Sequence, residues 1–314
     1  MQINSFFQKM NDGYELWVNR WLPNKDEDIK GIVQLHHGLA EHSMRYDRLG
    51  SVLAENGYIL NAYDFRGHGK SAENAISAGY GTFGKIANKD GFNIAIEDLK
   101  EIIQGVKNDF PGKKVILLGH SFGSFVSQGY IEKYSDTIDA CTLCGTSGPK
   151  NGLPKIGKIV VNIVNAFKGP DATSPLLANL AFGSYCKKIK NPKTPNDWIS
   201  KNEMNVQMYN DDKWCGISLT NSFFKDLMSG LIQIHKKSNM KKISVDLPIN
   251  FIYGKDDPVG SYGKSIEKLY SIYKKNGIKD LTIKAYPEDR HELFNEDNKE
   301  EVEKDLINWI EKIL

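Results

Sequence analysis

The chain has 314 residues, 40% of them hydrophobic and 25% charged, which is typical of a globular protein large enough for one α/β domain with an insertion. Its 41 basic and 39 acidic residues give a net charge of +2, so it lacks the basic excess of a nucleic-acid-binding protein. The N-terminal segment has neither the basic start nor the apolar core of a signal peptide. No apolar run approaches the roughly 20 residues that a membrane helix requires.

The first half of the chain alternates between strand and helix patterns. Apolar runs predict strands at 14–22, 31–38, 58–65, 114–121 and 139–146. Helical periodicity predicts helices at 47–56 and 93–109, where apolar residues recur at three- and four-residue steps. Because the strands are almost continuously apolar, we expect a mostly parallel sheet covered by helices on both faces.

The alternation stops near Gly148 and returns near Leu247. Helical and loop patterns fill 149–245, and strands are again predicted within 247–257 and at 281–288, followed by an amphipathic helix at 299–314. We therefore expect an α/β core in two parts, 1–148 and 246–314, interrupted by a helical cap at 149–245.

Two of the four cysteines, Cys141 and Cys144, are interpreted as buried structural thiols. Cys141 and Cys144 have C-x-x-C spacing, but they lie in a predicted strand and not at the helix N-terminus where a redox pair has a lowered pKa. Free cysteine is among the most buried residue types. A reducing, cytoplasmic location is the corresponding expectation.

Three reactive residue types follow the ends of three predicted strands. Ser121 lies in Gly-His-Ser-Phe-Gly after the strand at 114–121, Asp256 and Asp257 follow the strand at 248–254, and His291 follows the strand at 281–288. Ligands of open α/β sheets bind at the carboxyl ends of the strands. A serine, an acid and a histidine in this chain order predict a nucleophile elbow with a catalytic triad.

The acid and the oxyanion donors follow from the local sequence. Asp257 is favoured over Asp256 because Pro258 fixes the chain directly after it. The backbone N–H groups of Phe122, which follows the nucleophile, and of Leu39, which follows Gly38, are the expected oxyanion donors.

The remaining histidines are not expected to transfer protons. His37 and His42 are interpreted as braces of the loop after the strand at 31–38, and the segment Asp-Phe-Arg-Gly-His-Gly-Lys-Ser (64–71) as a further brace. His235 is predicted to be exposed.

Together these motifs resemble the monoacylglycerol lipase and lysophospholipase branch of the α/β-hydrolases, which is often grouped with serine aminopeptidases. The resembling segments are His37-Gly38 with Glu41-His42-Ser43, Asp64 with 66–71, 119–123, 254–259 and His291. The resemblance implies Ser121, Asp257 and His291 as the triad, Leu39 and Phe122 as oxyanion donors, and a helical cap. It implies hydrolysis of a single-acyl lipid ester without a metal or organic cofactor.

Other functions are considered beside this one. A dehalogenase or epoxide hydrolase of this fold would have an aspartate in place of Ser121. A serine aminopeptidase would hold the substrate amine with cap acids, and Glu203, Asp211 and Asp212 are candidates. A non-catalytic binding module would be expected to lack part of the triad. Acyl chain length, head group and oligomeric state are left open.

The cap segment at 156–167 has a continuous apolar stripe at helical spacing. The stripe consists of Ile156, Ile159, Val160, Ile163, Val164 and Phe167. Two interpretations are open. The stripe either packs inward as the inner surface of the cap, or forms an acyl-chain portal that transiently contacts a membrane or micelle.

Overall fold

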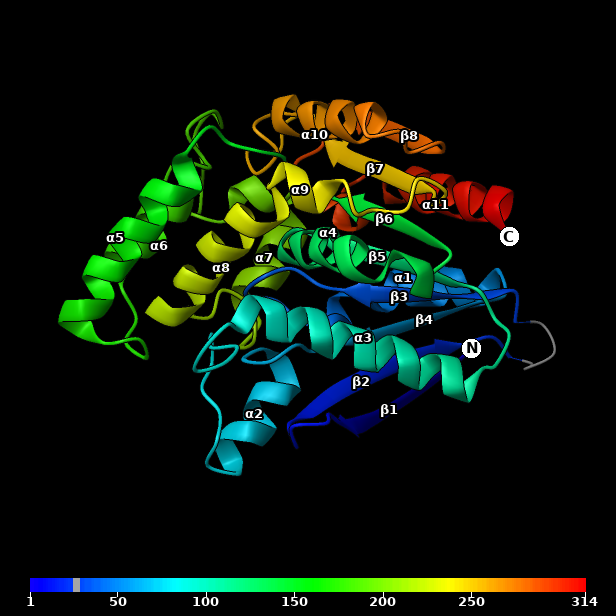
Figure 1. Ribbon diagram of the computed structural model, residues 1–314, viewed down its shortest axis with the longest axis horizontal. Helices are drawn as coiled ribbons and strands as arrows, with labels where there is room; N and C mark the ends of the chain where they lie inside the picture. Colours follow the sequence, from blue (N-terminus) through cyan, green and yellow to red (C-terminus); the bar gives the residue numbers. More distant parts are fainter. Residues whose placement is uncertain (25–28) are drawn as a thin grey trace.

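The computed structural model describes residues 1–24 and 29–314, and its centre is an eight-stranded sheet in the order β1-β2-β4-β3-β5-β6-β7-β8 (Figure 1). The strands are β1 (Gln2–Lys9), β2 (Glu15–Leu22), β3 (Gly31–His36), β4 (Tyr58–Tyr63), β5 (Val115–His120), β6 (Ala140–Cys144), β7 (Ile249–Gly254) and β8 (Leu281–Tyr286). β1 pairs with β2, and β2 with β4, in antiparallel orientation, and the other neighbours are parallel. The mostly parallel sheet predicted from the sequence is confirmed.

Helices cover both faces of this sheet. The helices of the described ranges, including those of the cap, are α1 (Asp47–Glu55), α2 (Gly69–Ser77), α3 (Gly91–Asp109), α4 (Phe122–Tyr134), α5 (Leu153–Lys168), α6 (Pro175–Phe182), α7 (Glu203–Asp211), α8 (Asn221–Ile234), α9 (Lys237–Met240), α10 (Lys264–Lys275) and α11 (Lys299–Ile313). Apolar residues of α3, α4 and α10 form one core layer, and those of α1 and α11 form the other. Every residue of β3 to β7 is therefore buried, which explains their unbroken apolar sequences.

The predicted elements of the core agree with the structure to within a few residues, and one strand was missed. β1 has no fully buried residue, and only its Phe6 packs partly on the core, so its sequence lacks the unbroken apolar run of the central strands. It is held by its antiparallel ladder to β2. Cys141 and Cys144 are free thiols buried in β6, as expected.

Helices α5 to α9 lie between β6 and β7 in the chain, where the cap is predicted at 149–245. Figure 1 shows α5 and α6 farthest from the sheet, with α8 between them and the core. α8 packs against α5 on one side and against α3 and α4 on the other. The exact cap boundaries stay a prediction. None of the helices in the described ranges is both long and apolar enough to cross a bilayer.

Candidate active site

Ser121 occupies the sharp turn between β5 and α4. Its backbone has φ 53° and ψ −119°, a strained conformation for a residue other than glycine. The turn is tight because a Cβ on Gly123 would lie 2.0 Å from the carbonyl oxygen of His36. The backbone N–H of Ser121 donates to the carbonyl of Cys144 at 3.0 Å, which ties the turn to the end of β6. This is the geometry of a nucleophile elbow, and a plain chain reversal would not require it.

Asp257 and His291 meet after β7 and β8. Nδ1 of His291 lies 2.9 Å from Oδ2 of Asp257, and both side chains are buried. Oδ1 of Asp257 accepts a hydrogen bond from the N–H of Val259 at 2.8 Å. Asp256, the alternative acid, is exposed. The contact with Asp257 leaves Nε2 of His291 free, and this atom has no hydrogen-bond partner among the described residues.

The charge of Asp257 controls the protonation of His291. Burial alone would lower the pKa of the imidazole, but the charge of Asp257 and its hydrogen bond outweigh burial and raise the pKa above 6.5. The same contact keeps the proton on Nδ1, so Nε2 presents its lone pair. Ser121 and His291 line the same cavity.

The two expected oxyanion donors lie beside Ser121. Phe122 is the first residue of α4, directly after the elbow. The loop with Leu39 approaches from the other side, since a Cβ on Gly38 would lie 3.1 Å from Cβ of Ser121. Among the hydrogen bonds of the described residues, the N–H groups of Leu39 and Phe122 have no acceptor. They are therefore available to an oxygen bound at the elbow.

A buried charge cluster that the sequence analysis missed joins the oxyanion loop to the histidine loop. Arg45 forms a two-fold contact with Glu292, the residue after His291, and its Nη1 lies 3.1 Å from Glu41. Glu41 in turn accepts from the N–H of Gly38 at 2.5 Å. Burial alone would raise the pKa of Glu292, but Arg45 overcomes this and holds it below its usual value. Only Glu41 belonged to a motif, and no sequence signal pairs Arg45 with a residue 247 positions away.

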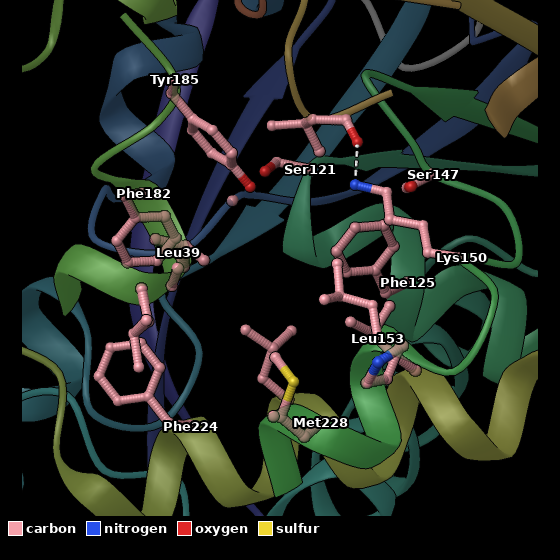
Figure 2. A pocket seen from close by; sticks show the side chains of 18 of the residues that line it. Leu39, Ser121, Phe125, Ser147, Lys150, Leu153, Phe182, Tyr185, Phe224 and Met228 are labelled. Carbon is pink, nitrogen blue, oxygen red and sulfur yellow. Dashed lines mark hydrogen bonds between the residues drawn. The ribbon is translucent and has the colours of Figure 1, made fainter. Parts of the chain in front are cut away.

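A cavity of about 300 Å³ opens above Ser121 and is enclosed mainly by apolar side chains of the cap (Figure 2). These come from α5, α6 and α8, among them Val160, Val161, Leu177, Phe182, Phe224, Leu227 and Met228. His235 also lines the cavity, where Nε2 lies 3.3 Å from the carbonyl of Ser147. The prediction that His235 is exposed is wrong, because the C-terminal end of α8 turns it inward. Burial lowers its pKa to about 4.

The apolar stripe on α5 is divided between two environments. Val160 and Val164 are half-buried and pack on the core, as the inner-surface interpretation requires. Ile156, Ile159 and Ile163 are 61%, 60% and 54% exposed, and Phe167 is 86% exposed. Ile156 nevertheless lines the cavity, so the inner-surface interpretation is wrong for Ile159, Ile163 and Phe167.

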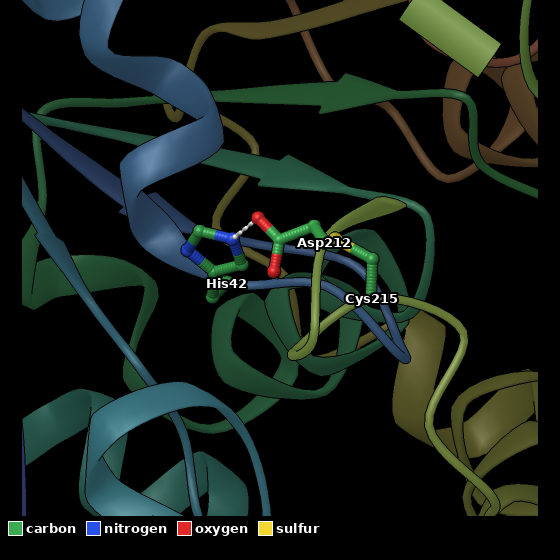
Figure 3. Close-up of side chains that lie close together, drawn as sticks. All are labelled: His42, Asp212 and Cys215. Carbon is green, nitrogen blue, oxygen red and sulfur yellow. Dashed lines mark hydrogen bonds and ion pairs between the residues drawn. The ribbon is translucent and has the colours of Figure 1, made fainter. Parts of the chain in front are cut away.

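His42, Asp212 and Cys215 form the one group of possible metal ligands in the described part of the chain (Figure 3). Nε2 of His42 already lies 2.8 Å from Oδ2 of Asp212, while Oδ1 accepts from the N–H of Trp214. Burial raises the pKa of the Cys215 thiol, opposite to what a metal thiolate requires. The cluster fits a brace between the loop after β3 and the cap, as expected for His42.

The cap acids considered for amine binding are occupied or remote. Asp212 is held by His42, Glu203 contacts Lys193 at 2.6 Å on the surface, and Asp211 accepts from Gln207. None of the three lines the cavity.

The order of the sheet, the elbow after β5 and the acid and histidine after β7 and β8 define the fold of an α/β-hydrolase, with Ser121 at its elbow. A family model described as serine aminopeptidase, S33, matches residues 27–298, and the chain belongs to this family of serine hydrolases. The resemblance stated from the motifs is confirmed.

Individual relatives match almost the whole chain. A monoacylglycerol lipase of Mycolicibacterium smegmatis is 26% identical over 303 residues, which is 95% of this chain and 93% of that protein. The monoglyceride lipase of Homo sapiens is 25% identical over 302 residues, 91% of this chain and 86% of that protein. A solved thermostable carboxyl esterase of Bacillus coagulans in complex with glycerol has a TM-score of 0.89 at 28% identity, over 100% of this chain and 99% of that one.

Proposed function

We propose that the protein is a serine carboxylester hydrolase that cleaves single-acyl lipid esters, such as a monoacylglycerol or a lysophospholipid, through Ser121, His291 and Asp257. The observation that carries this proposal is the apolar cavity that the cap encloses directly over the strained serine. An apolar chamber of this kind suits one acyl chain. The names of the relatives, monoacylglycerol lipase and carboxyl esterase, support the same substrate class.

Acylation begins when Oγ of Ser121 attacks the ester carbonyl carbon and Nε2 of His291 takes the hydroxyl proton. The carbonyl oxygen becomes an oxyanion, which the N–H groups of Leu39 and Phe122 stabilise. Asp257 stabilises the imidazolium through its contact with Nδ1. The bond to the leaving oxygen then breaks, and Nε2–H protonates the departing alcohol.

Deacylation repeats these steps with water. A water molecule attacks the acyl-enzyme while Nε2 of His291 accepts one of its protons, and the second tetrahedral oxyanion occupies the same donors. The bond from the acyl carbon to Oγ of Ser121 breaks, the proton returns to Oγ, and the free carboxylic acid leaves. The buried Arg45, through its two glutamates, joins the loops of Leu39 and His291.

The peptidase alternative has weaker support. A site for a substrate amine needs an unpaired carboxylate in the cavity, and the two glutamates that line it, Glu41 and Glu292, both contact Arg45. The cap acids Glu203, Asp211 and Asp212 do not line the cavity. We therefore favour ester cleavage over aminopeptidase activity. We place the reaction in the cytoplasm, since the buried thiols of Cys141 and Cys144 suit a reducing compartment.

We further propose that the outer face of α5 and α6 contacts the lipid aggregate from which the substrate comes. The face consists of Leu153, Ile156, Ile159, Ile163, Phe167, Leu176 and Leu180, each more than half exposed. Leu153, Ile156 and Leu180 also line the cavity, so the face is continuous with the cavity wall. Lys155 and Lys168 are exposed on the same helix and suit an anionic lipid surface.

The double substitution Ile159→Ser with Ile163→Ser tests this contact. Because both side chains are exposed, the melting temperature and the hydrolysis of a soluble acetate ester should stay close to wild type. Hydrolysis of long-chain monoacyl esters in micelles should fall clearly. Ile3→Ser, which removes an exposed apolar side chain on β1 far from the cap, is the control (Figure 1). Parallel losses on both substrates, with a drop in melting temperature, would exclude the membrane contact.

A hydrolysis panel tests the main proposal. It crosses acyl length with glycerol, lysophosphatidyl, simple alkyl and aminoacyl leaving groups, with Ser121→Ala as the inactive control. We expect turnover of single-acyl esters and loss of that turnover in Ser121→Ala. Turnover confined to the aminoacyl group would contradict ester hydrolysis and favour the peptidase alternative.

A further inference from the structure

Among the described residues that line the cavity, Lys150 is the one lysine or arginine. It follows β6 in the loop that leads to α5, and Figure 2 shows its side chain projecting into the cavity that also holds Ser121. Its Nζ donates one hydrogen bond, to the carbonyl of Val259 at 2.8 Å. An ammonium group has three donors, so two remain for another partner.

No carboxylate in the described ranges forms a salt bridge with Lys150. Asp257, the acid whose charge acts on Lys150, uses both oxygens for His291 and the Val259 N–H. Glu41 and Glu292 are both paired with Arg45. Glu41 lies two residues after Leu39, and Figure 2 shows Leu39 on the opposite side of the cavity from Lys150. A cation in an apolar chamber without a counter-charge is costly unless a ligand supplies one.

The surroundings of Lys150 add positive charge. Lys268 is close to the loop that contains Lys150, because its Nζ donates hydrogen bonds to the carbonyl of Pro149 and to Oδ1 of Asn151. Burial lowers the pKa of Lys150, and Asp257 partly opposes this shift. An anion bound at Nζ would favour the charged ammonium in the same way.

We propose that the Lys150 ammonium binds an anionic group that the substrate carries near its ester, so that the site prefers charged single-acyl esters over neutral ones. This inference rests on the proposed ester hydrolase function. The shared chemistry is a phosphate or carboxylate, either on the leaving alcohol, as in an acylglycerol phosphate, or on the acyl part, as in the monoester of a dicarboxylic acid.

A purely structural role is the competing explanation. Lys150 could simply fix the loop of Asp257 through the Val259 carbonyl, and its loss would then slow every substrate equally. Lys150→Gln removes the charge but keeps a hydrogen-bond donor, and Lys150→Arg keeps the charge. Lys268→Gln removes a neighbouring charge that does not line the cavity, and is the matched control.

The experiment compares kcat/KM on two matched pairs of esters in monomeric solution. One pair is a monoacylglycerol and the corresponding acylglycerol phosphate. The other is the methyl ester of a short carboxylic acid, such as butanoate, and the monomethyl ester of the dicarboxylic acid of equal length, succinate, whose carboxylate lies near the ester. In Lys150→Gln the ratio of anionic to neutral kcat/KM should fall roughly 10- to 100-fold in one pair. That pair identifies where the anion sits. Lys150→Arg should retain most of the preference, and Lys268→Gln should leave the ratio unchanged.

Unchanged ratios in both pairs, or equal losses on all four esters, would overturn the inference while ester hydrolysis stands. Failure of the wild-type protein to cleave any of the four would instead refute the proposed function. A binding experiment tests the role of Lys150 even in that case. Calorimetry measures the Kd of acylglycerol phosphate for the Ser121→Ala variant and for the double variant with Ser121→Ala and Lys150→Gln. Equal Kd values would also overturn the role of Lys150, and a roughly 10-fold or greater weakening would support it.

Discussion

Asp257→Asn is the most informative single substitution, because the structure separates this residue clearly from its neighbour Asp256. Asp257 is fully buried and accepts from His291 at 2.9 Å and from Val259 at 2.8 Å. An asparagine has one acceptor oxygen for these two donors. If its oxygen keeps the bond from Val259, its amide N–H₂ faces Nδ1 of His291, which must then be the acceptor.

The expected magnitude follows from that reversal. With Nδ1 accepting, the proton of the neutral imidazole moves to Nε2, where it cannot take the proton of Ser121. The wrong tautomer costs about 10⁴-fold in kcat in a serine triad. The pKa of His291 should also fall, because the charge of Asp257 is removed while burial, which lowers the pKa, remains.

The assay is kcat/KM against pH, from pH 5 to 9, on a soluble activated ester whose acylation is rate-limiting. Melting temperatures of all variants separate lost chemistry from lost folding. Asp256→Asn, at an exposed position, is the matched control and should stay within a few-fold of wild type. Equal losses for the two variants, or an unchanged pH profile in Asp257→Asn, would refute this assignment of the acid.

Three further expectations concern the same site. Ser121→Ala and His291→Ala should each lower kcat by roughly 10⁴-fold or more. The double variant should lose little beyond either single variant, because the two residues act as a unit. Multiplicative losses would contradict this. Leu39→Pro should lower kcat by roughly 10²–10³-fold, because proline has no backbone N–H to donate. Leu39→Ala keeps this N–H and should lower kcat only slightly. Equal kcat values for the two variants would point to another donor. Because His291 must be neutral to act as a base and its pKa is raised, kcat/KM should increase with pH through a value above 6.5; a flat profile would contradict a histidine base.

The core of the fold was predictable because its strands are buried along their whole length. Such strands read as unbroken apolar runs, and their carboxyl ends necessarily share one edge of the sheet. The positions of Ser121, Asp257 and His291 after β5, β7 and β8 follow from this arrangement alone. The edge strand β1 could not be found in the same way, since it contributes no buried residue.

Contacts between distant segments were beyond the reach of the sequence. Arg45 and Glu292 belong to different loops, and only the closed fold shows that they form a buried pair. The error on His235 has a related cause. Its neighbours Lys236 and Lys237 are polar and exposed, but the end of α8 directs the imidazole into the cavity.

The cap was the least predictable region because α5 is apolar on more than one side. Periodicity shows that a helix has an apolar stripe but not which surface covers it. In the structure, Val160, Val161 and Val164 face inward, and α8 approaches so closely that a Cβ on Gly157 would lie 2.7 Å from the sulfur of Met228. Ile159 and Ile163 then have no protein surface left to cover them. Exposed apolar side chains add nothing to the packing of the cap, so their exposure supports the proposed contact of this face with lipid.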